Sequence, residues 1–239
     1  MYDCVYIANM RIQKYLSQQK ILSRRETEDY IRKGLIKVNG KIIQEMGVQI
    51  DPVKDKVEIL QIGKADKERV TAAIYKPRGI VSSRNKKEGK TVFEIFPQFK
   101  NLNVVGRLDK ESEGLLLLSN DGIVTSAVTG SDHLIEKEYQ VTVQENVGLN
   151  KLKKMEEGIK IDGRMTLPAK TELLNSHNFL VILKEGRKHQ IRRMCAALNL
   201  TVTSLKRLRV GNINLKGISF GSYRILSPKE AENLKKLAA

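Results

Sequence analysis

A run of four consecutive leucines, Leu115–Leu118, limits most strongly how this chain can fold. Gly114 precedes the run and Asn120-Asp121-Gly122 follows it, so the apolar stretch is short and is bounded by residues that favour turns. Because leucine stands at both odd and even positions, both faces of a strand here would be apolar, which predicts a strand buried on both sides. The preceding loop, residues 106–114, would then be held against a core, which suits a catalytic group.

The rest of this region alternates between strand and turn patterns, with few helical stretches. Strands are predicted at residues 70–75, 115–118, 138–143 and 179–184, and helices near residues 149–157, 187–198 and 228–237. Several strands joined by turns, with few helices among them, indicate an α+β fold with a mainly antiparallel mixed sheet flanked by helices.

The first 60 residues follow a different pattern. Residues 10–33 predict two short helices, and Ser23 and Glu26 have the spacing of a capping box at the start of the second helix. Asn39-Gly40 is a strong hairpin signal, because a type I′ turn needs two positive φ angles. The expected organisation is a small αα-hairpin domain at residues 1–60 with its core at 10–59, a polar linker at 61–69, and a larger domain at 70–239.

The charge of the chain points to a polyanionic partner. Lys and Arg number 43 against 27 Asp and Glu, a formal net charge of +16. A basic surface gains counterion-release free energy on a phosphate backbone, so nucleic acid is the expected partner. Residues 184–216 hold nine of these cations and one acid, Glu185. A merely solvated surface usually mixes the two signs, so this stretch is expected to lie on a binding face.

Several function classes are disfavoured. The two cysteines, Cys4 and Cys195, are far apart and no CxxC or HExxH spacing occurs, so we expect no disulfide framework, no metal and no cofactor. A buried free thiol is the simpler interpretation of Cys195. No apolar run approaches the roughly 20 residues that span a bilayer, and no secretory signal is evident, so we expect no membrane association and a cytoplasmic protein.

The helix–helix–hairpin region resembles the S4 RNA-binding domain. The segment that carries the resemblance is RIQKYLSQQKILSRRETEDYIRKGLIKVNGKII, which begins at Arg11. The resemblance implies RNA contacts from its basic residues Arg24, Arg25, Arg32 and Lys37. The alternative is a generic αα-hairpin whose basic residues are only solvated.

The loop and the leucine run together, GRLDKESEGLLLLSNDG at residues 106–122, resemble the signature of the RsuA/RluB/RluE/RluF family of ribosomal RNA pseudouridine synthases. The segments YKPRG at 75–79, EKEYQVTV at 136–143 and EGRKHQIRRM at 185–194 resemble that family too, and its members join an S4 domain to a catalytic domain. The runs SDHLIEKEYQVTV and KHQIRRMC are most similar to the RluF-like branch. The resemblance implies an isomerase that converts a specific uridine of ribosomal RNA, of the large subunit by this branch, to pseudouridine.

By this resemblance Asp109 is the essential carboxylate, which attacks C1′ of the target nucleotide or abstracts a sugar proton. The neighbouring Arg107 and Lys110 are expected to keep it ionised. The resemblance further implies that Tyr139 contacts the base, that Arg107 helps to hold the nucleotide out of its stack, and that Arg192 pairs with Asp109. Tyr139 could alternatively be a core tyrosine.

Helical spacing also bears on Arg192. A buried stripe is predicted at positions i, i+3, i+4 and i+7, occupied by Ile191, Met194, Cys195 and Leu198. At about 100° per residue, Arg192 flanks this stripe while Arg193 points away from it. Arg192 could therefore reach a half-buried carboxylate, whereas Arg193 would contact phosphate or be solvated. His189 is not assigned a catalytic role.

Further RNA contacts are expected in the basic stretch, from Arg187, Lys188, Arg193, Lys206, Arg207 and Arg209. The expected partner is ribosomal RNA or a pre-ribosomal particle, with tRNA as a further candidate, and the protein is expected to be a monomer. Two alternative functions stay open. A noncatalytic S4-type RNA-binding protein would explain the charge but not the Asp109 motif, and an N-glycosidase would use the same carboxylate without rejoining the base.

Overall fold

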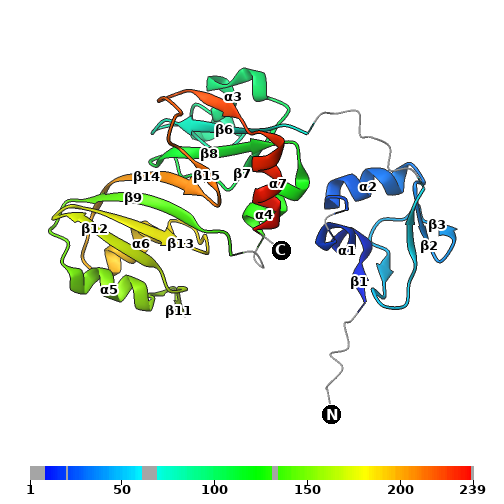
Figure 1. Cartoon of the computed structure of the whole chain (residues 1–239), viewed down its shortest axis with the longest axis horizontal. Helices are drawn as coiled ribbons and strands as arrows, with labels where there is room; N and C mark the ends of the chain where they lie inside the picture. The colour runs from blue at the N-terminus through cyan, green and yellow to red at the C-terminus, as the bar shows by residue number, and fades with distance from the viewer. Residues whose placement is uncertain (1–8, 20, 61–68, 131–133, 238–239) are drawn as a thin grey trace, which may run out of the picture. The chain divides into compact units, whose positions relative to one another are not determined.

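The computed structural model of this 239-residue chain describes residues 9–19, 21–60, 69–130 and 134–237. The chain divides into two compact units, residues 1–69 with 121–126 and residues 70–120 with 127–239 (Figure 1). Of the linker expected at 61–69, only Arg69 is among the described residues. Within the described ranges, no helix is both long enough and apolar enough to cross a bilayer.

The first unit is built from two helices and short strands. These are β1 (Met10–Arg11), α1 (Ile12–Gln18), α2 (Arg24–Arg32), β2 (Ile36–Val38), β3 (Lys41–Ile42), β4 (Gln49–Ile50) and β5 (Val57–Ile59). Strands β3, β2 and β5 form one antiparallel sheet and β1 pairs with β4. The predicted β2–β3 turn is confirmed, because Asn39 and Gly40 have φ angles of 51° and 78°.

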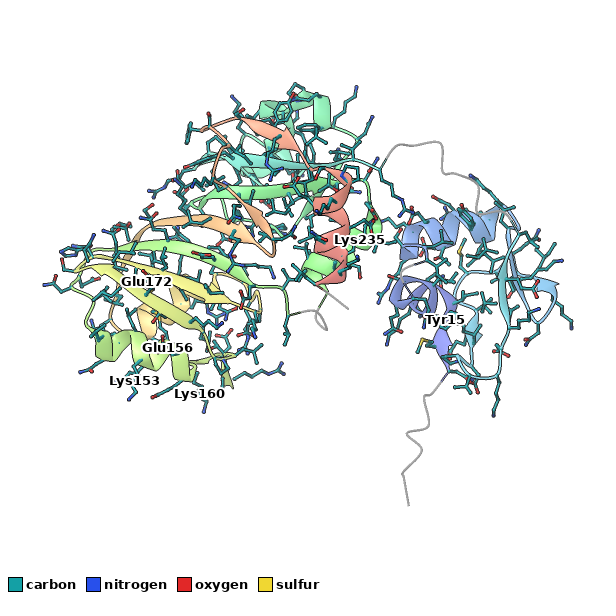
Figure 2. The ribbon with its side chains drawn as sticks, viewed as in Figure 1. Tyr15, Lys153, Glu156, Lys160, Glu172 and Lys235 are labelled. Carbon is teal, nitrogen blue, oxygen red and sulfur yellow. The ribbon has the colours of Figure 1, made fainter. Side chains whose placement is uncertain are left out.

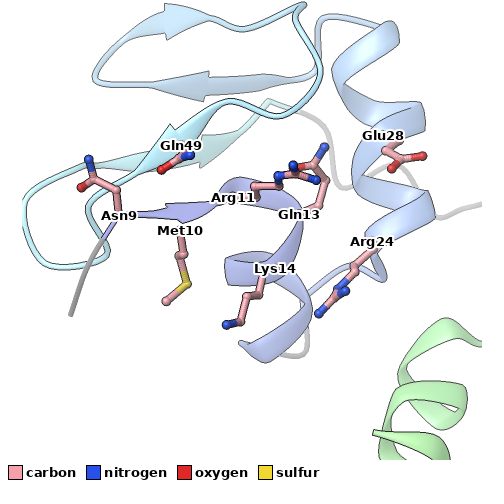
Figure 3. A pocket seen from close by; sticks show the side chains of 8 residues that line it. All are labelled: Asn9, Met10, Arg11, Gln13, Lys14, Arg24, Glu28 and Gln49. Carbon is pink, nitrogen blue, oxygen red and sulfur yellow. The ribbon is translucent and has the colours of Figure 1, made fainter. Parts of the chain in front are cut away.

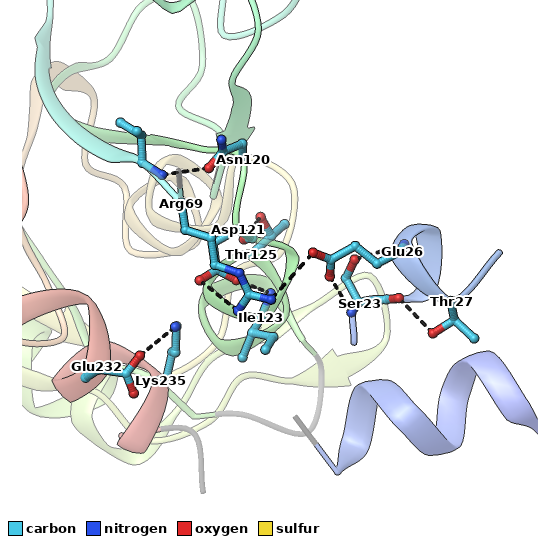
Figure 4. Close-up of polar contacts among 11 residues, drawn as sticks. Ser23, Glu26, Thr27, Arg69, Asn120, Asp121, Ile123, Thr125, Glu232 and Lys235 are labelled. Carbon is cyan, nitrogen blue, oxygen red and sulfur yellow. Dashed lines mark hydrogen bonds and ion pairs between the residues drawn. The ribbon is translucent and has the colours of Figure 1, made fainter. Parts of the chain in front are cut away.

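The start of α2 is fixed by its predicted capping box. Ser23 Oγ accepts a hydrogen bond from the Glu26 amide at 3.2 Å, and a Glu26 carboxylate oxygen accepts one from the Ser23 amide at 2.7 Å (Figure 4). These bonds satisfy amide groups that a helix start otherwise leaves without partners. Helices α1 and α2 then pack on the sheet through one apolar cluster, which includes Ile12, Leu16 and Ile31.

The second unit is a mixed sheet of nine strands. Its strands are β6 (Thr71–Lys76), β7 (Asn103–Val105), β8 (Glu113–Ser119), β9 (Lys137–Val143), β12 (Lys170–Asn175), β13 (Asn178–Leu183), β14 (Val202–Val210), β15 (Ile213–Asn214) and β16 (Tyr223–Ile225). The order is β12-β13-β9-β14-β8-β6-β16, with β7 beside β8 and β15 beside β14. Pairing is antiparallel except between β14 and β8, so the predicted fold class is confirmed. A separate hairpin joins β10 (Lys160–Ile161) and β11 (Arg164–Met165).

Helices flank this sheet. They are α3 (Val92–Ile95), α5 (Leu149–Glu157), α6 (Gln190–Ala197) and α7 (Pro228–Lys236), with 3₁₀ turns at Lys86–Glu88 and Pro97–Phe99. A further helix, α4 (Gly122–Thr129), is divided between the two units. The predictions of α5, α6 and α7 are confirmed, whereas α4 was expected only as a turn. The carboxylate of Asp121 accepts a hydrogen bond from the Ile123 amide at 2.9 Å and thereby caps the start of α4 (Figure 4).

Two apolar clusters lie in the second unit. One includes Val141, Phe179 and Met194, and the buried side of α5 contributes to it. The exposed side of α5 carries polar residues such as Lys153 and Glu156 (Figure 2). The other cluster contains Leu116 and Leu118. All four leucines of the run are 0% exposed, so the prediction of a strand buried on both faces is confirmed.

Candidate active site

Asp109 lies in the loop between β7 and β8, directly before the buried leucines. We call residues 106–112 the Asp109 loop. The Asp109 carbonyl accepts a hydrogen bond from the Ser112 amide at 3.1 Å, which closes a tight turn. The Asp109 side chain is 36% exposed. The carboxylate is therefore accessible, while the backbone that carries it is fixed.

Donors from distant parts of the chain hold the carbonyl groups of the Asp109 loop. The pairs are Arg207 to Gly106 at 2.8 Å, Ser82 to Leu108 at 2.7 Å, the Gly79 amide to Lys110 at 2.8 Å, Arg192 to Glu111 at 3.0 Å, and Lys76 to Ser112 at 2.6 Å. A loop whose backbone acceptors are satisfied in this way has little freedom to rearrange. The arrangement supports one position of the Asp109 carboxylate.

Lys76, at the end of β6, is one of these donors and is fully buried. Its ammonium group donates to the carbonyls of Pro77 at 2.9 Å and Ser112 at 2.6 Å. Burial lowers the pKa of Lys76 to about 8, although the nearby Asp109 and other carboxylates of the loop act in the opposite direction. At neutral pH the buried lysine therefore remains a cation in the surroundings of Asp109.

Arg207, on β14, is placed differently from the sequence expectation. It was expected at the RNA-binding surface, but its side chain is 1% exposed and donates to the carbonyls of Leu115 at 2.7 Å and Gly106 at 2.8 Å. Strand β14 runs parallel to β8 here, and Gly114 pairs with Arg207. A Cβ atom at Gly114, whose φ is 102°, would come within 3.0 Å of the Arg207 backbone. Arg207 thus connects two strands and the Asp109 loop inside the protein.

Helix α6 and the residue before it approach the same loop. Arg192 donates to the carbonyls of Glu111 at 3.0 Å and Val202 at 3.3 Å, rather than to the Asp109 carboxylate as the resemblance implied. The basic side chain that lies closest to the Asp109 carboxylate in the described ranges is His189, whose Nε2 is 3.4 Å away. His189 has a left-handed backbone, with φ of 53°. Sequence reasoning gave it no role, and no signal in the sequence marks this conformation.

Tyr139 and Arg107 are the other residues expected at the site. Tyr139 lies on β9 between Val181 and Arg207, is half-buried and packs against both apolar clusters. Within the described ranges its hydroxyl group makes no hydrogen bond, so both a base contact and a core role are compatible with its position. Arg107 is exposed and makes no ion pair with a described residue, which leaves its guanidinium group available to RNA.

The remaining basic residues differ in their surroundings. Those in ion pairs are Arg187 with Glu185 at 3.1 Å, Arg193 with Asp162, Arg209 with Glu138 at 2.8 Å, and Arg32 with Asp29 at 2.7 Å. Arg24, Arg25 and Lys188 are exposed and unpaired as far as the described residues show. Lys37 is half-buried near Glu58, and Lys206 lies 5.1 Å from the ring centre of Tyr75, beside a pocket of about 410 Å³. Charge alone therefore overstated the number of free cations.

The structure also bears on cysteine and metal chemistry. Cys195 is fully buried, and burial raises the pKa of its thiol to about 12, so the interpretation as a buried free thiol is confirmed. Among the described residues, no group of three or more His, Cys, Asp or Glu side chains could hold a metal ion.

Comparison with known proteins gives the family. Residues 70–197, more than half of the chain, match the family model described as RNA pseudouridylate synthase. This chain belongs to the RNA pseudouridylate synthase family. It is therefore an isomerase. The resemblance to ribosomal RNA pseudouridine synthases that was noted in the sequence is confirmed. A second match, of residues 10–56 to the S4 domain, accounts for the first unit of this pseudouridylate synthase.

Relatives of different specificity resemble this pseudouridylate synthase about equally. It is 35% identical to the ribosomal large subunit pseudouridine synthase B of Bacillus subtilis, over 95% of this chain and 96% of the relative. It is 35% identical to the dual-specificity RNA pseudouridine synthase RluF of Escherichia coli, over 96% of this chain and 80% of the relative. It is 34% identical to the ribosomal small subunit pseudouridine synthase A of Haemophilus influenzae, over 95% of this chain and 100% of the relative. These identities do not single out one branch.

A solved structure supports the fold of the synthase. The crystal structure of a pseudouridylate synthase superposes with a TM-score of 0.69 at 32% sequence identity. The similarity covers 94% of this chain and 99% of that one.

Proposed function

We propose that this protein converts a specific uridine of ribosomal RNA to pseudouridine, with Asp109 as the essential carboxylate. The observation that carries the proposal is the Asp109 loop, in which an accessible carboxylate stands on a backbone held by donors from several distant elements. The relatives named for the two ribosomal subunits support ribosomal RNA as the substrate class.

The reaction breaks the bond between N1 of uracil and C1′ of the ribose, and forms a bond between C5 and C1′. Asp109 either attacks C1′ or removes a sugar proton, and both routes release uracil, which stays within the active site. When C5 of the turned base bonds to C1′, the bond between Asp109 and C1′ breaks, or in the other route the sugar proton is returned from Asp109. The proton on C5 is then lost and N1 is protonated, so no atom is gained or lost. This chemistry needs one well-placed carboxylate and a site that excludes water from the detached base.

The charges around the loop suit this role. Lys76, Arg192 and Arg207 each donate to a loop carbonyl, so three cations lie close to the backbone that carries Asp109. Each of them holds a different part of the backbone beside Asp109. Arg107, next to Asp109 and unpaired within the described ranges, would hold the target nucleotide out of its stack, and Tyr139 would contact its base.

Of the ribosomal RNAs, the proposed substrate is that of the large subunit. This assignment rests on the RluF-like segments and on the large-subunit name of the Bacillus relative. Small-subunit RNA and tRNA are the competing substrates, since one relative is named for the small subunit and another for dual specificity. We propose that the enzyme acts as a monomer in the cytoplasm on ribosomal RNA or a pre-ribosomal particle.

Pseudouridine mapping in cells tests the proposal. Ribosomal RNA and tRNA are isolated from cells that carry the wild-type gene, a deletion, Asp109→Asn, or the control Asp29→Asn at an exposed position of α2. Carbodiimide mapping should show one pseudouridine that is absent in the deletion and the Asp109→Asn strain and present in the control. A site that persists in the Asp109→Asn strain would refute the role of Asp109.

The same experiment separates the alternative functions. Asp109→Asn should bind RNA with nearly wild-type affinity, because the lost group acts chemically and binding is spread over many phosphate contacts. An N-glycosidase would leave abasic RNA and free uracil instead of a carbon-linked base. A noncatalytic RNA-binding protein would leave the pseudouridine map of every RNA unchanged on deletion.

A further inference from the structure

A polar network that the proposed reaction does not use directly holds the segment that leads into α6. Its central residue is Glu185, whose side chain is 17% exposed. One carboxylate oxygen, Oε1, accepts hydrogen bonds from the Gln190 side-chain amide at 2.7 Å and from the Leu167 backbone amide at 3.0 Å. The other oxygen, Oε2, accepts one from Arg187 Nε at 3.1 Å. Three donors on one half-buried carboxylate fix its position in the fold.

The network encloses His189. Gln190 Oε1 accepts a hydrogen bond from the Arg187 amide at 2.9 Å, and the Arg187 carbonyl accepts one from the Gln190 amide at 3.2 Å. Residues 187–190 therefore form a turn that is closed both through the backbone and through the buried Gln190 side chain. His189 is the third residue of this turn, with φ of 53° and ψ of 30°. A residue other than glycine keeps this left-handed conformation when the surrounding structure imposes it.

The backbone of His189 decides where its ring lies. The side chain is 48% exposed, so packing covers only part of it, and yet Nε2 lies 3.4 Å from the Asp109 carboxylate. The direction of a side chain follows from the backbone that carries it. The bonds that fix the turn at 187–190 therefore also fix the distance between His189 and Asp109.

The same network reaches the β10–β11 hairpin. The Arg187 guanidinium group donates to the carbonyls of Arg164, at 3.2 Å, and Met165. The Leu167 amide, which donates to Glu185, lies just after the hairpin. Glu185 and Arg187 thus attach the turn before α6 to a second element, which limits the freedom of the turn to move alone.

We propose that Glu185 is a positioning residue of the active site. Through Arg187 and Gln190 it holds the turn that sets His189 beside Asp109. Its carboxylate is engaged by groups of the protein and acts on the reaction only through His189. The proposal rests on the proposed function, because it concerns the surroundings of the Asp109 carboxylate.

A double-mutant cycle tests whether Glu185 acts through His189. The assay is the release of tritium from C5 of uridine in a transcript that contains the uridine found by the mapping above. Glu185→Met removes all three hydrogen bonds at nearly constant side-chain length and should lower kcat about fivefold with KM unchanged. His189→Asn should have the same effect. The double variant should also lose about fivefold, whereas independent effects would multiply to about 25-fold.

Two further variants make the cycle specific. Glu185→Gln keeps an oxygen that can accept from Gln190 and Leu167 but loses the charge that faces Arg187. Its kcat should therefore lie between the values of the wild type and Glu185→Met. Glu172→Met, at an exposed position of β12, is the matched control and should keep the wild-type kcat (Figure 2).

The second readout needs no RNA. The chain has three histidines, so the ring signals of His189 can be assigned in NMR spectra with His189→Asn. In the otherwise wild-type chain, Asp109→Asn should shift these signals, because the carboxylate is 3.4 Å away. In the Glu185→Gln chain the same substitution should shift them less, because the ring is no longer held beside position 109. This readout decides the question even if Glu185→Met disturbs the fold.

Three results would overturn the proposal. They are an unchanged kcat in Glu185→Met, whether or not KM rises, a loss of about 25-fold in the double variant, and equal ring shifts in the wild-type and Glu185→Gln backgrounds. The ring shifts are measured without turnover. Failure of the positioning role is therefore distinguishable from failure of the proposed function, which the Asp109→Asn map tests.

Discussion

Basic side chains of the two units differ in their burial and in their hydrogen bonds. In the second unit, Lys76 and Arg207 are buried and donate to backbone carbonyls of the Asp109 loop and β8. In the first unit, Arg11, Lys14 and Arg24 are exposed and have no ion-pair partner within the described ranges (Figure 3). The same residue types therefore fix the backbone of the Asp109 loop in one unit and stand free on the surface of the other. The difference depends on what surrounds each cation.

The largest effect is expected from Arg207→Met. The substitution leaves the buried carbonyl of Leu115 and the half-buried carbonyl of Gly106 without the Arg207 donor, at a cost of up to about 1–3 kcal/mol each. The free energy of unfolding should fall by about 2–5 kcal/mol, as measured by urea unfolding, and activity should fall with it. Arg24→Met should change stability by less than about 0.5 kcal/mol, because Arg24 is exposed. Equal stability losses in the two variants would remove the distinction between the two groups of cations.

Lys76 should give the stability of the protein an unusual pH dependence. Its pKa in the folded chain, about 8, lies below the ordinary value of 10.5. Between these pH values the unfolded chain binds more protons than the folded chain, so this site makes stability rise with pH from about 8 to 10.5 and contributes no slope below 8. The sign is opposite to that of a lysine in an ion pair, whose pKa is raised.

The measurement is urea unfolding at pH 8, 9 and 10 for wild type, Lys76→Met and the exposed control Lys100→Met. Relative to Lys76→Met, the wild type should gain on the order of 1–2 kcal/mol across this range. The control should follow the wild type. A difference between wild type and Lys76→Met that stays constant with pH would show that burial does not lower the pKa of Lys76.

His189 is expected to have a smaller, kinetic effect. His189→Asn retains a residue that tolerates the left-handed backbone but removes the ring that lies 3.4 Å from the Asp109 carboxylate. Loss of a contact worth about 1 kcal/mol should lower kcat about fivefold and leave KM and the melting temperature unchanged. His177→Asn, at an exposed turn, is the control. A change in KM at constant kcat would instead mean that His189 binds RNA.

These residues also show which features of the structure could be predicted from the sequence. Local signals were reliable: the capping box at Ser23, the turn at Asn39-Gly40 and the leucine strand are each decided by neighbouring residues, and each is confirmed. The burial of Arg207 was not predictable, because it follows from carbonyls that lie about a hundred positions earlier in the chain. The proximity of His189 to Asp109 likewise depends on a backbone conformation that only the packed structure imposes.

The smallest effect concerns the salt dependence of RNA binding. Arg24 and Arg32 are both exposed on α2, but Arg32 is paired with Asp29 at 2.7 Å whereas Arg24 has no ion-pair partner among the described residues. An unpaired cation that neutralises one phosphate contributes about 1 to the slope of log K against log salt concentration. Arg24→Gln should lower that slope by about 1, and Arg32→Gln by less, because Arg32 must first give up its carboxylate. The slopes come from anisotropy titrations of the full chain with a ribosomal RNA fragment between 50 and 200 mM salt. If Arg32→Gln lowered the slope as much as Arg24→Gln, pairing within the protein would not predict which cations meet RNA, and the contrast between the two units would rest on burial alone.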